Sequence, residues 1–479
     1  MTEFPKLEVA PGAHLLEIFH EGRKLHGQVV LEASRWPSLD LIDDVEEVDF
    51  TSPAFHSGPK EYEFPRLVGL MASKQDVVLI DSRLLNWWIG RSQGKCRYAI
   101  AGLGVAEVPD DRYHKVRFQI TEAEMLFGIA PIKSVHWPRE GAPPDQPYSA
   151  VVNEASSQTW RDEVDGLSID CSFDHKFTLS DPFHHELVFA PVIQFTADDP
   201  MTVDDWQKLW IVPFLEVASL ATRKPQRLSW LTVHTGPKKM DTSGVVFAHG
   251  IDQAPAAAEF RDEWRDPNAL PLFSLNALPS GLPKFLRGWR TLRASDNPFV
   301  ELSQLALNQP DLPPRARFLY LIQALEALHG FENRVAEEAR RERFVQKRQE
   351  VIDEISTKEV PVQSLQFIKE KWGRRRPDSL SRRLKEILAE LPPDVRGQVE
   401  TPEMSTIAAE LTAASVTTLE GQLEKLRNNL SHGNRNYPSR DLQPWVASVE
   451  LICRANLLRL QGFDATAVVN GLLPATRTH

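Results

Sequence analysis

An arginine and a histidine that lie close together near the C-terminal end could cleave a phosphodiester bond. In the segment LRNNLSHGN, Arg427 is followed directly by Asn428 and then, after three further residues, by His432. Histidine titrates near neutral pH and can act as a general acid or base. Arginine stabilises negative charge that gathers on phosphate, and Asn428 offers a further hydrogen-bonding group. These residue types are suited to cutting RNA without a metal ion.

The geometry of this pair depends on where its helix ends. Consecutive residues of an α-helix are rotated by about 100°, so five positions correspond to about 140°. Arg427 and His432 could therefore not share one face of a straight helix. The sequence SHGN is typical of a helix end, with Gly433 as the left-handed cap. We expect His432 to leave the helix axis there and to turn back toward Arg427.

The spacing alone does not identify a catalytic pair. The chain has 14 histidines, and Arg227 and His234 show a similar spacing in a segment typical of a strand. An alternative interpretation makes Arg427 a surface arginine and His432 a histidine that faces the dipole at a helix end. The surrounding elements must decide between the two interpretations.

The N-terminal part is typical of a β-rich domain. Short β-branched and aromatic segments, such as LHGQVVLEAS and HELVFAPVIQF, alternate with turns rich in Pro, Gly, Asp and Ser. One helix is expected to begin at Thr202 or Asp204, and Pro213 should kink or interrupt it. Its apolar face would hold Trp206, Trp210, Phe214 and Val217. We assign this β-rich domain to residues 1–275.

Residues 276–479 are predicted to form an all-α bundle, so the fold class is α+β and multidomain. The segment RARFLYLIQALEALHGF places apolar residues on one helical face: Phe318, Leu321, Ile322, Leu325 and Leu328. A second helix covers VTTLEGQLEKLRNNL, and a closing helix starts near Asp441. Short connections between such helices favour an antiparallel bundle.

A basic stretch between residues 334 and 383 is a candidate surface for RNA. The chain as a whole has a formal net charge of -11, so a polyanion needs a local basic patch. The predicted phosphate contacts are Arg374, Arg375, Arg376, Arg382 and Arg383. The alternative is a solvated, ion-paired helix surface, because several glutamates, among them Glu337 and Glu342, are interleaved with these arginines.

Composition excludes several other classes of protein. The three cysteines are far apart in the sequence and form no CxxC pair, which argues against a disulfide framework or a zinc site. We expect neither a metal nor a cofactor. The N-terminal segment does not have the pattern of a secretory signal, and the apolar segments are too short to span a bilayer. The expected location is the cytoplasm, without membrane attachment.

Three features together resemble the ApeA-like branch of the HEPN superfamily (higher eukaryotes and prokaryotes nucleotide-binding). They are the QALE segment that ends at Glu326, the polar, basic insertion after it, and the RN-x(3)-H motif from Arg427 to His432. GWRTL and PFVELSQLAL resemble the entry to the helical domain of ApeA-like proteins. The β-rich part with its tryptophan-containing helix is similar to their N-terminal domain. The resemblance therefore covers most of the chain.

This resemblance implies a metal-independent endoribonuclease that acts as a homodimer through its HEPN domain. His432 would assist attack of the ribose 2′-hydroxyl on the neighbouring phosphate, Arg427 would stabilise the developing charge, and Asn428 would position one or the other. Glu326 is a further candidate, because HEPN domains often carry an acidic residue near the active site; otherwise it is a solvated or ion-paired glutamate. The implied role is anti-phage defence through RNA damage, with the N-terminal domain as a sensor of a phage-derived trigger. The alternative is a non-catalytic HEPN module that binds nucleotide or RNA, or that serves as the partner of a nucleotide-modifying enzyme.

Overall fold

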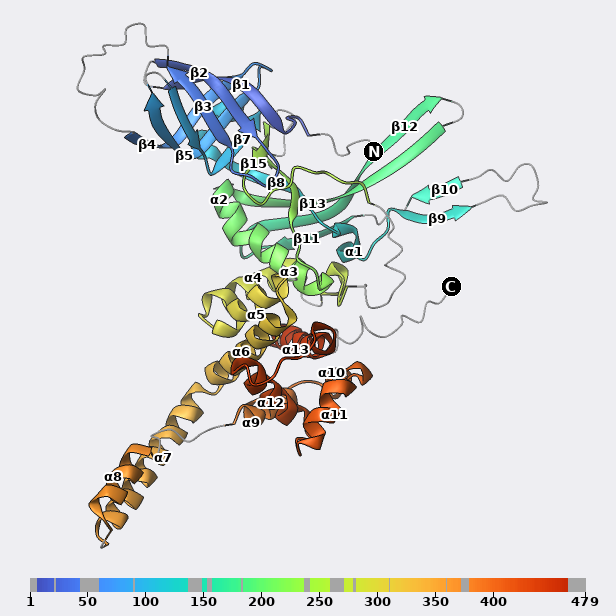
Figure 1. Cartoon of the computed structure of the whole chain (residues 1–479). Helices are drawn as coiled ribbons and strands as arrows, with labels where there is room; N and C mark the ends of the chain where they lie inside the picture. Colours follow the sequence, from blue (N-terminus) through green and yellow to red (C-terminus); the bar gives the residue numbers. More distant parts are fainter. Residues whose placement is uncertain are drawn as a thin grey trace, which may run out of the picture. The chain divides into compact units, whose positions relative to one another are not determined.

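The computed structural model divides the chain into two compact units, Met1–Arg287 and Gly288–His479. It describes residues 7–20, 23–43, 60–88, 91–136, 149–152, 157–181, 184–236, 242–258, 271–278, 281–309, 311–358, 360–371 and 379–463. The first unit is rich in strands and the second is helical (Figure 1). The predicted order of a β-rich part followed by a helical bundle is therefore confirmed.

The first unit begins with strands that close into a ring. Within the described residues these are β1 (Gly12–His20), β2 (Arg23–Leu31), β3 (Ser38–Asp43), β4 (Lys60–Met71), β5 (Asp76–Trp88) and β6 (Arg91–Lys95). They pair antiparallel in the order β5-β4-β1-β2-β3-β6, and β6 pairs again with β5. Gly94 permits this last pairing, because a Cβ atom there would lie 2.1 Å from the carbonyl oxygen of Arg83.

The inside of the ring is apolar because side chains alternate along each strand. In β1, Leu16 and Ile18 are buried, whereas Leu15 and Phe19 point outward and are exposed. Residues from the other strands complete the same cluster: Val29, Leu31, Leu39, Leu41, Leu67, Val77, Leu79 and Leu84. Burial of this cluster is the main stabilising contribution to the ring.

A second group of strands continues from β5. β7 (Tyr98–Gly102) pairs with β5, and the order then runs β7-β15-β14-β8-β13-β12-β11. The bounds are β8 (Arg112–Ile120), β11 (Gln158–Asp162), β12 (Leu167–Asp181), β13 (His184–Thr202), β14 (Leu228–His234) and β15 (Ser243–Phe247). β12 and β13 form a long hairpin, and β9 (Ile132–His136) and β10 (Ser149–Val152) form a separate one (Figure 1).

A helical segment packs against the second group of strands, at the position predicted from its tryptophans. It comprises α2 (Val203–Trp206), the π-helical turn Gln207–Ile211 and α3 (Val212–Thr222). Thr202 and Asp205 form a reciprocal capping box at its start. Trp206, Trp210, Phe214 and Val217 are all buried, as predicted. The chain remains helical on both sides of Pro213. The irregularity in this segment is the π-helical turn, which lies just before the proline, a residue that has no backbone N–H to donate.

A short helix, α1 (Ala123–Phe127), completes the β-rich unit, and α4 (Leu282–Ala294) crosses the boundary between the units. The remaining helices are α5 (Pro298–Asn308), α6 (Pro314–Glu332), α7 (Arg334–Ser356), α8 (Val362–Lys371), α9 (Leu380–Ala389), α10 (Pro393–Val399), α11 (Ser405–Ala413), α12 (Leu419–Ser431) and α13 (Ser439–Leu460). α6 is central, because it contacts α5, α7, α9, α12 and α13. The five apolar residues predicted for its buried face are all buried.

None of the helices that the structure describes combines the length and the apolar character needed to cross a lipid bilayer.

Candidate active site

The candidate site lies where α12 packs against α6. Leu423, Leu426 and Leu430 of α12 are fully buried and fix the rotation of this helix about its axis. Arg427 follows Leu426 directly, so its side chain emerges at the edge of the buried face and is 35% exposed. On α6, Glu326 follows the buried Leu325 in the same way and is 24% exposed.

Packing of the two helices brings Arg427 and Glu326 together. Nη2 of Arg427 lies 3.5 Å from Oε1 of Glu326. Nη1 of Arg427 donates a hydrogen bond of 3.2 Å to Oδ1 of Asn428. Three of the four predicted catalytic side chains therefore form one cluster. A guanidinium group has five N–H donors, so Arg427 keeps donors for a phosphate group.

His432 marks the end of α12, as predicted. It is the C-cap residue, and its backbone N–H donates to the carbonyl of Asn428 at 3.1 Å. Gly433 has a φ of 66°, which is the left-handed conformation expected of a helix-ending glycine. Asn434 N–H then donates to the Asn429 carbonyl at 3.1 Å. The backbone thus leaves the helix axis at His432.

The side chain of His432 is exposed, next to the cluster in sequence but not bonded to it. Among the described residues, no hydrogen bond or ion pair joins the imidazole to Arg427 or Glu326. Because an exposed imidazole on a helix end can rotate about its side-chain bonds, its ring is free to meet a substrate. The helix ends at His432, whereas the expected turn of this residue back toward Arg427 stays a prediction.

Residues that the sequence analysis missed hold this helix end. Nη2 of Arg315, at the start of α6, donates to the carbonyl oxygen of Leu430. Nδ2 of Asn429 donates to the Tyr437 hydroxyl at 2.9 Å, and this hydroxyl donates to Glu410 at 3.3 Å. Burial raises the pKa of Tyr437, which keeps the hydroxyl protonated as a donor. No local motif marks these residues, because the contacts join different helices.

The predicted phosphate contacts fall into two groups. Arg374, Arg375 and Arg376 lie outside the described residues. Arg382 and Arg383 lie on α9, which packs against both α6 and α12. Nε of Arg382 is 3.1 Å from Glu386, and Nη2 of Arg383 is 3.6 Å from Glu337. Both side chains therefore already have carboxylate neighbours, although they remain partly exposed.

These arginines belong to a network around His329, which the sequence analysis also missed. His329 is buried near the end of α6, with Nε2 2.6 Å from Glu386 and Nδ1 3.3 Å from Glu337. The hydrogen bond with His329 lowers the pKa of Glu386, and Arg382 adds to this effect. The network ties α6, α7 and α9 together and so supports the helix that carries Glu326.

No group of three or more His, Cys, Asp or Glu residues in the described part of the chain could hold a metal ion. All three cysteines are free and buried. Burial raises the pKa of the Cys453 thiol, which makes it a poor nucleophile.

Comparison with known proteins identifies the β-rich part. Residues 20–289, more than half of the chain, match the family described as ApeA N-terminal domain 1. No curated protein matches the sequence. The chain therefore belongs to the ApeA N-terminal domain 1 family, which indicates an ApeA-like protein of anti-phage defence.

Proposed function

We propose that the helical unit is a HEPN-type endoribonuclease that cuts RNA without a metal ion and serves anti-phage defence in the cytoplasm. The observation that carries the proposal is the cluster of Arg427, Asn428 and Glu326 beside the helix end at His432. A cation that stabilises charge on phosphate and an imidazole that acts as general acid or base are suited to metal-free phosphodiester cleavage.

In the proposed reaction His432 accepts the proton of a ribose 2′-hydroxyl while its oxygen attacks the adjacent phosphorus. The bond from phosphorus to the 5′-oxygen breaks, that oxygen takes up a proton from water, and the imidazole later returns its proton to the solvent. The products are a 2′,3′-cyclic phosphate end and a 5′-hydroxyl end. Arg427 stabilises the negative charge on the equatorial phosphate oxygens, and Asn428 orients Arg427 through their hydrogen bond.

The ion pair of Arg427 with Glu326 is compatible with this role. The two groups are 3.5 Å apart and partly exposed, and pairs of this kind contribute about 0–1 kcal/mol. A phosphate group can therefore replace the carboxylate at the guanidinium without a large cost. Glu326 would hold Arg427 in place until substrate arrives.

A homodimer is the proposed active form. The imidazole of His432 is exposed, and within the described residues it has no bonded partner in its own chain. A second copy that brought its own helix end to the same phosphate would supply a facing pair of arginine and histidine. RNA is the substrate, and a phage component is the proposed trigger.

The test is expression of wild type, His432→Ala and Arg427→Ala from a controlled promoter, with growth and total RNA measured with and without phage. RNA cleavage and growth arrest are expected only with wild type, and cleavage by the purified protein should persist in EDTA. Arg440→Ala is the matched arginine control, since Arg440 lies on α13 and is 87% exposed. His175→Ala, on β12, is the histidine control. Unchanged cleavage in His432→Ala would refute the proposed role of this residue.

One observation favours a second candidate, a non-catalytic module that binds RNA or nucleotide. Arg427 already has a carboxylate neighbour, and His432 does not contact it. Tight RNA binding by wild type with no cleavage under any of these conditions, phage included, would support this second function.

A further inference from the structure

A cavity of about 740 Å³ lies within the β-rich unit, whereas Arg427 and His432 belong to the helical unit. It lies where the closed ring of strands meets the second group of strands. Its lining comes from the interior of β4 and β5, from the end of β6 and from the loops beside them, and it includes Trp36, Glu63, Asp81, Arg83, Lys95 and Arg97. Pockets of roughly 300–1,000 Å³ commonly hold small organic ligands.

The cavity follows from a change of partner in the middle of β5. Before Asp81, β5 pairs with β7, and after it β5 pairs with β6. Asp81 has a φ of 52°, and the ladder between β4 and β5 passes from Phe64 to Arg66 without pairing Pro65. Proline has no N–H to donate, so Pro65 adds no hydrogen bond to the ladder between β4 and β5, although the register of the two strands continues unchanged. The cavity lies at this interruption.

The cations of the lining are not all neutralised. Lys95 is exposed and, among the described residues, makes no hydrogen bond or ion pair. Arg83 is 3.2 Å from Glu63, but both side chains are about two-thirds exposed, so this pair is weak. The lining has three cations (Arg83, Lys95, Arg97) against two carboxylates (Glu63, Asp81), in a chain whose net charge is -11.

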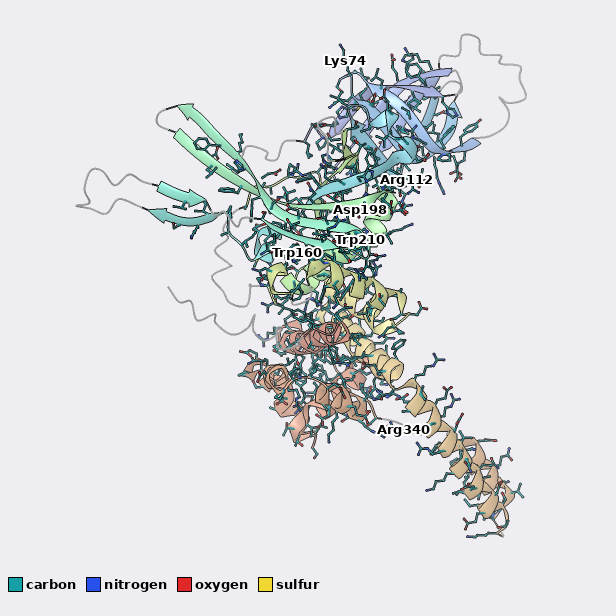
Figure 2. The ribbon with its side chains drawn as sticks, turned by 180° about the vertical axis from the view of Figure 1, so that it is seen from behind. Lys74, Arg112, Trp160, Asp198, Trp210 and Arg340 are labelled. Carbon is teal, nitrogen blue, oxygen red and sulfur yellow. The ribbon has the colours of Figure 1, made fainter. Side chains whose placement is uncertain are left out.

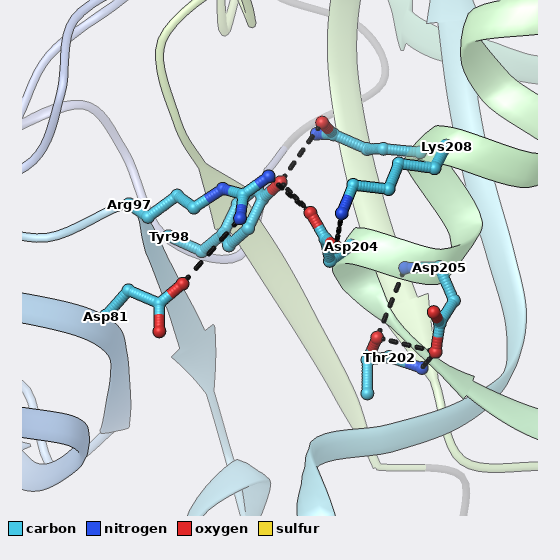
Figure 3. A network of polar contacts seen from close by, with 8 residues as sticks. Asp81, Arg97, Tyr98, Thr202, Asp204, Asp205 and Lys208 are labelled. Carbon is cyan, nitrogen blue, oxygen red and sulfur yellow. Dashed lines mark hydrogen bonds and ion pairs between the residues drawn. The ribbon is translucent and has the colours of Figure 1, made fainter.

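Arg97 is held rigidly at one wall (Figure 3). Its guanidinium pairs with Asp204 and lies 3.7 Å from Asp81. Lys208 binds the other oxygen of Asp204 at 2.5 Å, and the Tyr98 hydroxyl is 3.3 Å from Asp204. Burial raises the pKa of Tyr98 to about 12, so it remains a donor. This wall is therefore preorganised, whereas Lys95 is free to meet a ligand.

Two further groups in the lining have unused capacity for binding. Trp36 is 46% exposed, and it is stacked on His249 with ring centroids 5.3 Å apart and planes 20° apart. This stacking fixes a large aromatic surface at the cavity. Ser82 is only 1% exposed, and its hydroxyl has no hydrogen-bond partner among the described residues. A buried hydroxyl without a partner is uncommon.

We propose that this cavity binds a nucleotide, as a second site that is independent of the RNA-cutting site. Trp36 stacks on the base, and Lys95 and Arg83 bind the phosphate. The same chemistry is offered by a free mononucleotide and by the terminal nucleotide of an RNA chain.

The experiment is isothermal titration of the full chain with AMP, GMP, CMP and UMP, each alone, and with a 5′-phosphorylated RNA trinucleotide. The background is His432→Ala, so that no RNA is cut. Adenosine and inorganic phosphate serve as half-ligands. At least one nucleotide should bind more tightly than either half-ligand, because base and phosphate are both recognised. Tighter binding of the trinucleotide than of any mononucleotide would identify an RNA end as the ligand.

The variants Lys95→Gln and Trp36→Leu should each weaken binding by about tenfold. Lys95→Arg should retain most of it, because the charge is kept. Lys74→Gln is the matched control, since Lys74 lies in the turn between β4 and β5 (Figure 2) and is not among the residues that line the cavity. Thermal unfolding of each variant establishes that it is folded. Absence of binding at millimolar concentration, or equal affinity in Lys95→Gln and Lys74→Gln, would overturn the proposal.

Discussion

Replacement of Glu326 by glutamine should tighten RNA binding without a large loss of stability. The carboxylate lies 3.5 Å from the guanidinium of Arg427. In bulk water two unit charges at this distance attract by about 1.2 kcal/mol, and partial burial would raise the figure. Side-chain ordering and solvent oppose it, so a net contribution of at most about 1 kcal/mol is expected. The free energy of unfolding should fall by no more than this amount.

The same interaction competes with RNA phosphate for Arg427. If phosphate must displace the carboxylate, then removal of its charge should improve affinity by up to about fivefold, the equivalent of about 1 kcal/mol. The assay is fluorescence anisotropy of a labelled RNA in the His432→Ala background, at several salt concentrations. The improvement should shrink as salt increases, because both the carboxylate and the phosphate interactions are screened.

Glu332→Gln provides the matched control for Glu326→Gln. Glu332 is also on α6 and also pairs with an arginine, Arg459, at 2.8 Å. It should change stability by a similar amount but leave RNA affinity unaltered. Weaker RNA binding in Glu326→Gln, or an equal change in both variants, would refute competition at Arg427. A loss of several kcal/mol in stability would show that the pair is structural.

Three further changes test the elements that position the site and the strands. Leu426→Ala, in the fully buried face of α12, should lower the free energy of unfolding by about 2–5 kcal/mol in urea denaturation and reduce RNA cleavage, because the helix that carries Arg427 loses its packing. The pKa of Glu386 lies below its ordinary value of 4.5. The contribution of this carboxylate to stability is therefore present above pH 4.5 and is lost as the pH falls through the lowered pKa. Glu386→Gln should make the free energy of unfolding less dependent on pH in this acid range, and an unchanged pH profile would contradict the network around His329. Thr202→Ala removes the capping box of α2 and should cost about 0.5–2 kcal/mol in thermal or urea unfolding, whereas Thr202→Ser should cost less.

Local features of the chain were predictable from the sequence. The end of α12 at His432 and Gly433 was predicted because a helix end is decided by hydrogen bonds between residues a few positions apart. The buried faces of α6 and of the helical segment with Trp206 follow from periodicity in the same way. The succession of a β-rich part and a helical part is likewise a property of local composition and pattern.

Contacts between distant segments were decided only by the tertiary structure. Glu326 was a candidate from the sequence, but its pairing with Arg427 depends on how α6 packs against α12. Arg315, Tyr437 and His329 carry no motif, because their partners lie on other helices.

The cavity in the β-rich unit has the same origin. It exists because β5 exchanges one partner strand for another at Asp81, and no local pattern reports which strands will pair. Alternating residues predict that a strand has a buried face, but several pairings can bury that face equally well. The sequence therefore determines the elements and their ends, whereas long-range packing determines which side chains meet.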